Sequence, residues 1–137
     1  MGVFDGFQGT QINLTPQVGM AAGLFYLAAA DGHLDPDERG DILKIVPDDN
    51  ILNQGINYAR LNPWPAFLPA VAAVLTPQQK LCMILNIADM AMGDGSLHPR
   101  EMQMLNEMQR AFGIDDATIQ PYVQALMTKN NLTPFGW

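Results

Sequence analysis

Two short acidic motifs contain the residues of this sequence that are best suited to chemistry. Both read D-G-x-L-x-P-x-E, and they run from Asp31 to Glu38 and from Asp94 to Glu101. Carboxylate oxygens are the ligands that hard divalent cations such as Ca²⁺ and Mg²⁺ prefer in proteins. The repeated spacing predicts an internal duplication that places one pair of acids in each copy.

Each motif matches only part of the calcium-binding loop of an EF-hand. Its Asp, Gly, Leu and Glu fall at loop positions five, six, eight and twelve. Positions one and three, which should supply oxygens, are Leu27 and Ala29 in the first copy and Met90 and Met92 in the second. These apolar residues exclude an EF-hand. A cation would need further oxygens from the backbone, from water or from the other copy.

Asp89 is a further candidate ligand. It lies in an apolar run five residues before Asp94, where an ionised carboxylate needs a partner. A helix edge that faces solvent is the alternative interpretation. If a pseudo-twofold axis brings the two motifs together, repulsion among their acids favours a bound cation. The predicted metal ligands are Asp31, Glu38, Asp89, Asp94 and Glu101.

Helix capping alone is a second explanation of the motif. Its Gly ends one helix, its Leu packs against the next helix, its Pro is the first residue of that helix, and its Glu accepts a hydrogen bond from the N-cap amide. Asp35 and His98 occupy the N-cap positions and are interpreted as caps. The glycines would end their helices without the preceding Asp31 and Asp94, so those acids are left without a structural reason.

The rest of the chain predicts a helical domain that positions these motifs. Of 137 residues, 48% are hydrophobic and 15% are charged, which excludes a disordered chain and favours a compact core. Apolar residues recur at helical spacing, and no segment alternates with the period of a strand. We expect one all-α domain of about seven helices, with two helix–loop–helix repeats related by a pseudo-twofold axis.

The expected boundaries follow from the same pattern. Residues 1–14 form an N-terminal arm, residues 15–129 the helical domain and residues 130–137 a C-terminal tail. Within the domain, the first repeat spans about 15–62 and the second about 63–129.

An apolar helix leads each repeat and should lie at its centre. Each is expected to begin at a Thr-Pro pair and to end at the motif glycine, Gly32 or Gly95, with a difference of two residues in length. Gly19 and Gly23 should let the first of these helices cross a neighbour closely. The single cysteine, Cys82, excludes an intramolecular disulfide and is interpreted as a small core residue.

Prolines complicate two later helices. The segment after Asn62 is expected to form a bent or two-part helix up to about Leu75, because an interior Pro removes a hydrogen bond. The last helix is expected to follow an N-cap at Thr118, which would place Pro121 in its first turn. The expected apolar faces of the last two helices are Met102, Leu105, Met108 and Phe112, and Ile119, Tyr122, Val123 and Leu126.

Charge and hydropathy narrow the choice of partners. The net charge of −7, with seven scattered basic residues, argues against a nucleic-acid partner and favours cations or basic partners. The apolar segments 18–30 and 81–92 are shorter than the roughly 18 residues that a membrane span needs, so none is expected. The N-terminus does not resemble a secretory signal, which favours a cytoplasmic location.

The sequence resembles the TerB tellurite-resistance family and its wider set of TerB-like domains. The resemblance covers about residues 15–129 and rests on the signature A-D-G-x-L-x-P-x-E, seen from Ala30 to Glu38 and, with Gly93 in place of Ala, up to Glu101. It implies an all-helical fold with an internal repeat, an acidic surface proposed to bind metal, and a role in resistance to tellurite and other chemical stress. A similar domain occurs in a membrane-bound J-domain co-chaperone, so the fold alone does not fix the function.

The resemblance has one departure, because Tyr26 stands where the second copy has Asp89. We therefore expect the first half-site to be the weaker. The predicted function is a non-enzymatic stress-response module that binds a divalent cation (Ca²⁺, or Mg²⁺ or Mn²⁺) and/or a protein partner, such as another stress-response or membrane-associated protein, through its acidic face.

Two alternatives remain open. One is a metal-dependent enzyme in which Asp89 or a neighbouring acid acts as a base, and the other is a purely structural scaffold. The sequence contains no recognisable Ser/His/Asp or Cys/His set, phosphate loop or H-E-x-x-H helix. A deep apolar pocket beside Asp89 would favour the enzyme, and a shallow acidic surface would favour the binding module.

Overall fold

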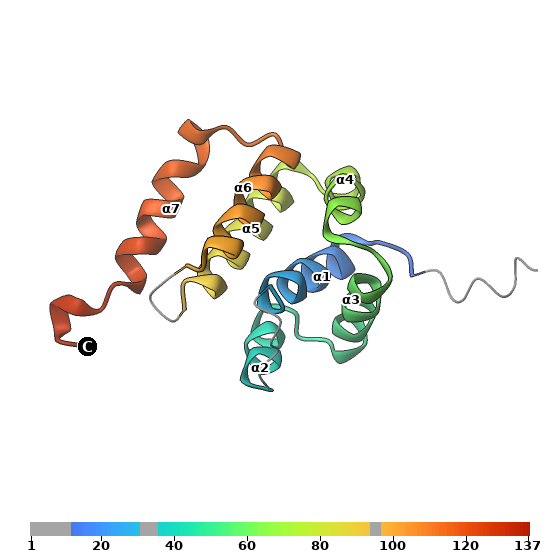
Figure 1. Cartoon of the computed structure of the whole chain (residues 1–137), viewed down its shortest axis with the longest axis horizontal. Helices are drawn as coiled ribbons and strands as arrows, with labels where there is room; N and C mark the ends of the chain where they lie inside the picture. Colours follow the sequence, from blue (N-terminus) through green and yellow to red (C-terminus); the bar gives the residue numbers. More distant parts are fainter. Residues whose placement is uncertain (1–11, 31–35, 94–96) are drawn as a thin grey trace, which may run out of the picture.

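The computed structural model describes residues 12–30, 36–93 and 97–137, except for the side chains of residues 36–38. These residues form seven α-helices and a short 3-10 helix, with no strand among them (Figure 1). The expected all-α fold is confirmed. In chain order the elements are α1 (Pro16–Ala28), α2 (Pro36–Ile45), α3 (Asp49–Leu61), α4 (Trp64–Val74), α5 (Pro77–Ala91), α6 (Pro99–Ala111), α7 (Asp116–Asn130) and η2 (Thr133–Phe135).

Side chains of N-cap residues stabilise the first turns of several of these helices. Thr15 caps α1 by accepting a hydrogen bond from the amide of Val18, at 3.2 Å. Thr76 caps α5 in the same way through the amide of Gln79, at 3.1 Å, and Asp48 caps α3. α1 has 13 residues and α5 has 15, the expected difference of two.

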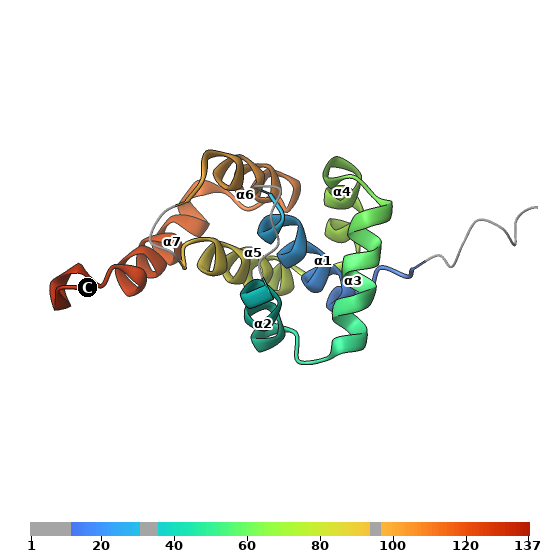
Figure 2. The ribbon, with the colours of Figure 1, turned by 60° about the horizontal axis from the view of Figure 1, so that its bottom comes forward.

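α1 is the central helix of the fold, as expected. It contacts α2, α3, α4 and α5, and Figure 2 shows it enclosed by those helices. α1 is apolar on nearly every side, which is typical of a helix that is covered by neighbours on several sides. Its buried residues are Val18, Gly19, Ala21, Ala22, Gly23, Leu24 and Leu27.

Small residues let the neighbouring helices approach α1 closely. A Cβ atom at Gly19 would lie 2.7 Å from Cγ2 of Val71 on α4, and one at Gly23 would overlap Cε of Met83 on α5. The expected close crossings are therefore present. A third crossing involves Gly55 of α3, whose role the sequence analysis missed.

An aromatic cluster joins α1, α3 and α4. The Tyr26 ring centroid lies 4.8 Å from that of Phe67 and 5.3 Å from that of Trp64, while the Tyr58 ring contacts Phe67 edge-on. Tyr26 donates a hydrogen bond to the carbonyl of Asn62. Burial raises the pKa of the Tyr26 hydroxyl, so this group stays neutral. Tyr26 is thus a packing residue of the first half of the chain.

The structure corrects several expected helix boundaries. α1 ends at Ala28, before the expected stop near Gly32, which lies outside the described residues. α4 is one continuous helix that includes Pro69, so the two-part alternative is wrong. A single interior Pro costs one backbone hydrogen bond, and the apolar residues of α4 are buried on either side of it.

α7 also begins earlier than expected. Asp115, and not Thr118, is its N-cap, and the Asp115 carboxylate accepts a hydrogen bond from the Thr118 amide at 2.8 Å. This bond lowers the pKa of Asp115. Pro121 therefore lies inside α7, beyond the first turn where the sequence analysis placed it.

Some residues of α6 and α7 that were expected to face the core are exposed. On α6 the buried methionines are Met104 and Met108, whereas Met102 is 44% exposed. Tyr122 of α7 is 47% exposed, although it was expected to face the core. Cys82 is also exposed, because it lies on the outer side of α5.

No helix within the described ranges has the length and apolar composition needed to cross a membrane. The tail after α7 contains η2, where Phe135 and Trp137 stack with their ring centroids 5.8 Å apart. Figure 1 shows α7 and this tail at one end of the molecule, beside α5 and α6.

Candidate functional site

Two of the five predicted metal ligands have described side chains. Asp89 lies near the end of α5, and Glu101 lies in the first turn of α6. Asp31 and Asp94 lie outside the described residues, as does the side chain of Glu38. The convergence of all five acids therefore stays a prediction.

Glu101 closes the start of α6. Its Oε1 atom accepts a hydrogen bond from the backbone amide of His98, at 3.1 Å, which is the capping contact expected for the Glu of the motif. The motif residue Leu97 and the α6 residue Met102 line the same cavity, as expected if Leu97 packs against the first turn of α6. The capping explanation is thus met at this helix.

Asp89 joins α5 to the end of α7. Its Oδ1 atom accepts hydrogen bonds from Nδ2 of Asn130 at 2.8 Å and from Nζ of Lys129 at 3.1 Å, and Nζ also lies 3.3 Å from Oδ2. The Asn130 hydrogen bond, followed by the bond and positive charge of Lys129, lowers the pKa of Asp89. The partner that an ionised acid needs in this apolar helix is therefore supplied by α7.

The remaining acids of the described residues are dispersed. Among residues 12–30, 36–93 and 97–137, apart from the undescribed side chains, no three His, Cys, Asp or Glu residues gather as a metal site. Arg39 pairs with Asp49, and Lys44 with Asp41, both on the surface of the first half. The metal site predicted from the sequence therefore depends on the acids of the two motif loops.

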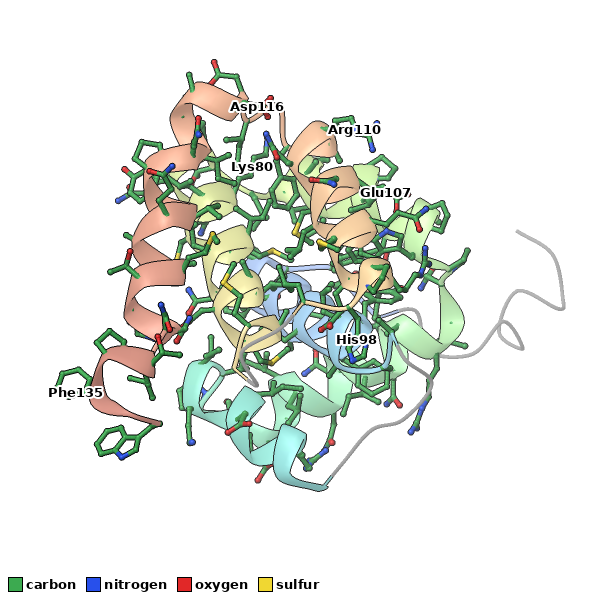
Figure 3. All side chains as sticks on the ribbon, turned by 60° about the vertical axis from the view of Figure 1, so that its left-hand side comes forward. Lys80, His98, Glu107, Arg110, Asp116 and Phe135 are labelled. Carbon is green, nitrogen blue, oxygen red and sulfur yellow. The ribbon has the colours of Figure 1, made fainter. Side chains whose placement is uncertain are left out.

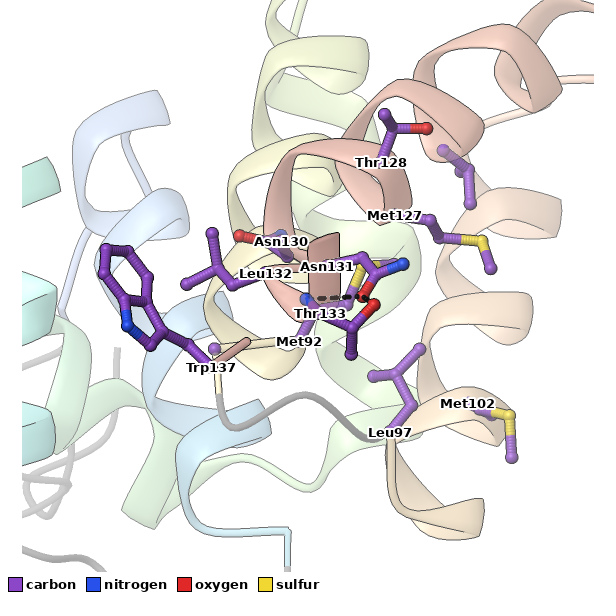
Figure 4. A pocket seen from close by; sticks show the side chains of 12 residues that line it. Met92, Leu97, Met102, Met127, Thr128, Asn130, Asn131, Leu132, Thr133 and Trp137 are labelled. Atoms are coloured by element: carbon purple, nitrogen blue, oxygen red, sulfur yellow. Dashed lines mark hydrogen bonds between the residues drawn. The ribbon is translucent and has the colours of Figure 1, made fainter. Parts of the chain in front are cut away.

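An apolar groove separates α7 from α5 and α6. We call it the α5–α7 groove. It consists of two adjoining cavities of about 860 Å³ and about 180 Å³ that share Met92, Leu97, Met102 and Val123. Figure 4 shows Met127, Leu132 and Trp137 around the larger cavity, and Figure 3 views the molecule from the α7 side.

Helical periodicity predicted a single apolar face on α6, and this prediction left no place for the groove. In fact Met104 and Met108 face the core, whereas Met102 and Leu105 line the groove. The signal was available: apolar residues at Met102, Met104 and Leu105 cannot all lie on one face of a 3.6-residue helix.

The surroundings of Asp89 do not favour its use as a catalytic base. An apolar cavity does lie near Asp89, but Asp89 is not among its lining residues, and its carboxylate is held by α7. A general base is favoured by a raised pKa, whereas the pKa of Asp89 is lowered. Asp89 is better suited to linking helices than to abstracting a proton.

Residues 63–122 match the TerB family. The matching family model is described as tellurite resistance protein TerB, and the matched segment comprises α4, α5, α6 and the first part of α7. The expected resemblance is thereby confirmed for this segment, which contains Asp89, Asp94 and Glu101. The first motif lies outside the matched residues. Comparisons with curated proteins and with solved structures gave no match.

The TerB match therefore covers the second acidic motif together with two walls of the α5–α7 groove. It supports a tellurite-resistance-like module at the level of the family.

Proposed function

We propose that this chain is a non-enzymatic, cytoplasmic stress-response module whose duplicated acidic motif binds a divalent cation, alone or together with a protein partner. The TerB match over the second motif supports the assignment to tellurite resistance or a related stress response. The acids of the motif provide only oxygen ligands, which suit Ca²⁺, Mg²⁺ or Mn²⁺.

The first turns of α5 and α6 are capped by different side chains, and this difference supports the proposal. At α5, Oε1 of Gln79 accepts a hydrogen bond from the Thr76 amide at 2.9 Å, and at α6, Oε1 of Glu101 accepts one from the His98 amide at 3.1 Å. A neutral side chain is thus sufficient for this cap. The negative charge of Glu101 has to be explained by the helix dipole, which favours an acid by about 0.3–1 kcal/mol, or by a bound cation.

Each copy of the motif supplies too few oxygen ligands for a complete cation site, so the affinity for the cation should be modest. Positions that supply oxygens in an EF-hand are apolar here, and Ca²⁺ prefers six to eight oxygen ligands. Glu101 would contribute the carboxylate oxygen that does not cap α6. Backbone carbonyls, water and the other motif acids would supply the remaining ligands.

Thermal unfolding in Ca²⁺ or Mg²⁺ tests the proposal. A ligand that binds only the native state at ten times its Kd stabilises the protein by about 1.4 kcal/mol, so millimolar Ca²⁺ or Mg²⁺ should raise Tm. NaCl at matched ionic strength should reproduce little of this gain. Asp94→Asn and Glu101→Gln should abolish the metal-dependent shift and raise metal-free stability, because they relieve charge repulsion while Gln keeps the capping oxygen.

Gln79→Ala is the matched control. It removes the equivalent cap from α5 and should lower stability by about 0.5–1 kcal/mol, with the cation response unchanged. The metal proposal fails if the parent protein shows no cation response in calorimetry and if Asp94→Asn and Glu101→Gln simply lower Tm, because the motif would then act only as a helix cap.

A further inference from the structure

Within the part of the chain that the structure describes, nothing covers several apolar side chains of the α5–α7 groove. Met102 on α6 is 44% exposed, Met127 on α7 is 59% exposed, and Leu132 in the tail is 46% exposed. α7, which the structure describes in full, buries only Ile119. Contiguous exposed apolar surface of this kind marks a binding site more often than chance exposure does.

The size and lining of the groove suit a helix. The larger cavity measures about 860 Å³, toward the upper end of the range of about 300–1,000 Å³ for ligand pockets, and the smaller cavity extends it along α5 and α6. Met92, Met102 and Met127 lie on its walls (Figure 4). Methionine side chains are flexible and polarisable, and they recur where proteins receive the apolar face of an amphipathic helix.

The electrostatics of the groove favour a basic partner. Both α5 and α7 end at the larger cavity, where Met92, Gly93, Asn130 and Asn131 line its wall. Helix C-termini carry a partial negative charge. Lys129 in the last turn of α7 offsets the charge of that C-terminus, and Glu101 offsets the opposite charge of the α6 N-terminus. The C-terminus of α5, which has no basic residue in its last turn, is left as the negative end at the groove. None of the described lining residues has a charged side chain, so no lysine or arginine of the groove would repel a basic helix.

Charge also selects against a second copy of this chain as the occupant. Each copy has a net charge of −7, so two copies repel each other at long range, whereas a basic segment is attracted. We propose that the α5–α7 groove binds a basic amphipathic helix of another protein. This surface differs from the acidic motif of the proposed function, and its occupation does not require a cation.

Calorimetry with a defined peptide tests the groove. The probe is a synthetic helix of about 14 residues composed of Leu and Lys, with Leu at positions i, i+3, i+4 and i+7. A peptide with Glu in place of every Lys and a Leu/Lys peptide of scrambled order are the controls. In EDTA, so that cation binding plays no part, the basic amphipathic peptide should bind at least tenfold more tightly than either control.

Paired variants locate the binding surface. The double variant Met102→Gln, Met127→Gln keeps side-chain length and helix propensity at two exposed positions, and it should weaken peptide binding at least tenfold. Leu61→Gln is the matched control, because Leu61 is 70% exposed on α3, outside the groove. It should leave the affinity unchanged. Unchanged Tm values will show that all variants are folded.

Three results would overturn the proposal. Equal binding of the basic and acidic peptides would remove the charge argument, and unaltered binding to the double variant would place the peptide elsewhere. A dimer in sedimentation that the double variant dissociates would assign the groove to a second copy of this chain.

Discussion

α3 packs in the first half of the molecule and α7 in the second. The two helices have the same kind of N-cap but bury different numbers of residues. Each follows an Asp N-cap, Asp48 or Asp115, and each buries an aliphatic residue four positions later, Leu52 or Ile119. Beyond that turn the two helices diverge. α3 also buries Gly55, Ile56 and Tyr58, whereas α7 buries nothing more.

One position shows this difference clearly. Seven residues after the capping Asp, α3 has Gly55 and α7 has Tyr122. A Cβ atom at Gly55 would lie 2.6 Å from Cβ of Ala21 and 2.7 Å from the backbone nitrogen of Ala22, so α3 lies backbone to backbone against α1. α7 has no glycine at the corresponding position: Tyr122 is 47% exposed and lines neither cavity of the groove. α7 contacts α5 beside the α5–α7 groove, without the backbone-to-backbone approach that Gly55 permits.

The largest expected effect is at Leu27, in the first half of the molecule. Leu27→Ala should cost about 2–5 kcal/mol, the range for large-to-small changes in a packed core, because Leu27 is 1% exposed. Leu85→Ala should cost less, because Leu85 is only partly buried and lines the groove. Denaturant midpoints of both variants measure the difference. Equal losses would show that the second half is as tightly packed as the first.

Gly55→Ala should come next. The added methyl group would overlap backbone atoms of α1, and overpacking of this kind costs about 1–3 kcal/mol, against a gain of about 1 kcal/mol in helix propensity. We expect a net loss in urea unfolding. Gly40→Ala is the control: a Cβ atom there meets no described atom within 4 Å, so this change should stabilise α2. Stabilisation by Gly55→Ala would show that α3 can move away freely.

Asp89→Asn should have a smaller effect on stability and should loosen the contact between α5 and the end of α7. The Asp89 side chain is 37% exposed, and ion pairs of this kind contribute at most about 1 kcal/mol. We expect faster amide hydrogen exchange at the end of α7 and little change in α3. Because folding lowers the pKa of Asp89 below its ordinary value of 3.8, its contribution is present at neutral pH and is lost as the pH falls through the folded pKa. The stability difference between parent and variant should therefore shrink under acid conditions.

Tyr122→Ala should have the smallest effect. It changes the α7 position that corresponds to Gly55, but its ring is 47% exposed, and surface substitutions usually stay within about 0.5 kcal/mol. Denaturant unfolding provides the measurement. A loss above about 2 kcal/mol would mean that this ring packs as a core residue and that the groove is more closed than its geometry indicates.

The helix starts that were predicted correctly depend on residues close together in the chain. Thr15 and Thr76 each bond to an amide three positions later, so the sequence alone contains the whole interaction. The predicted start was wrong where a helix could begin at either of two residues. Asp115 and Thr118 are both good caps, and only the packed position of Ile119 separates the two possibilities.

The sequence by itself determined the all-helical class, the central position of α1 and the acidic motif, because these follow from periodicity, small residues and local caps. The tertiary structure alone decided that Asp89 binds Lys129 and Asn130, which follow it by about forty residues in the chain. It also decided which of the apolar residues Met102, Met104 and Leu105 face the core. The physical reason is that such contacts depend on the distance between helices, and this distance is set by residues on the partner helix, as Gly55 shows for α1 and α3.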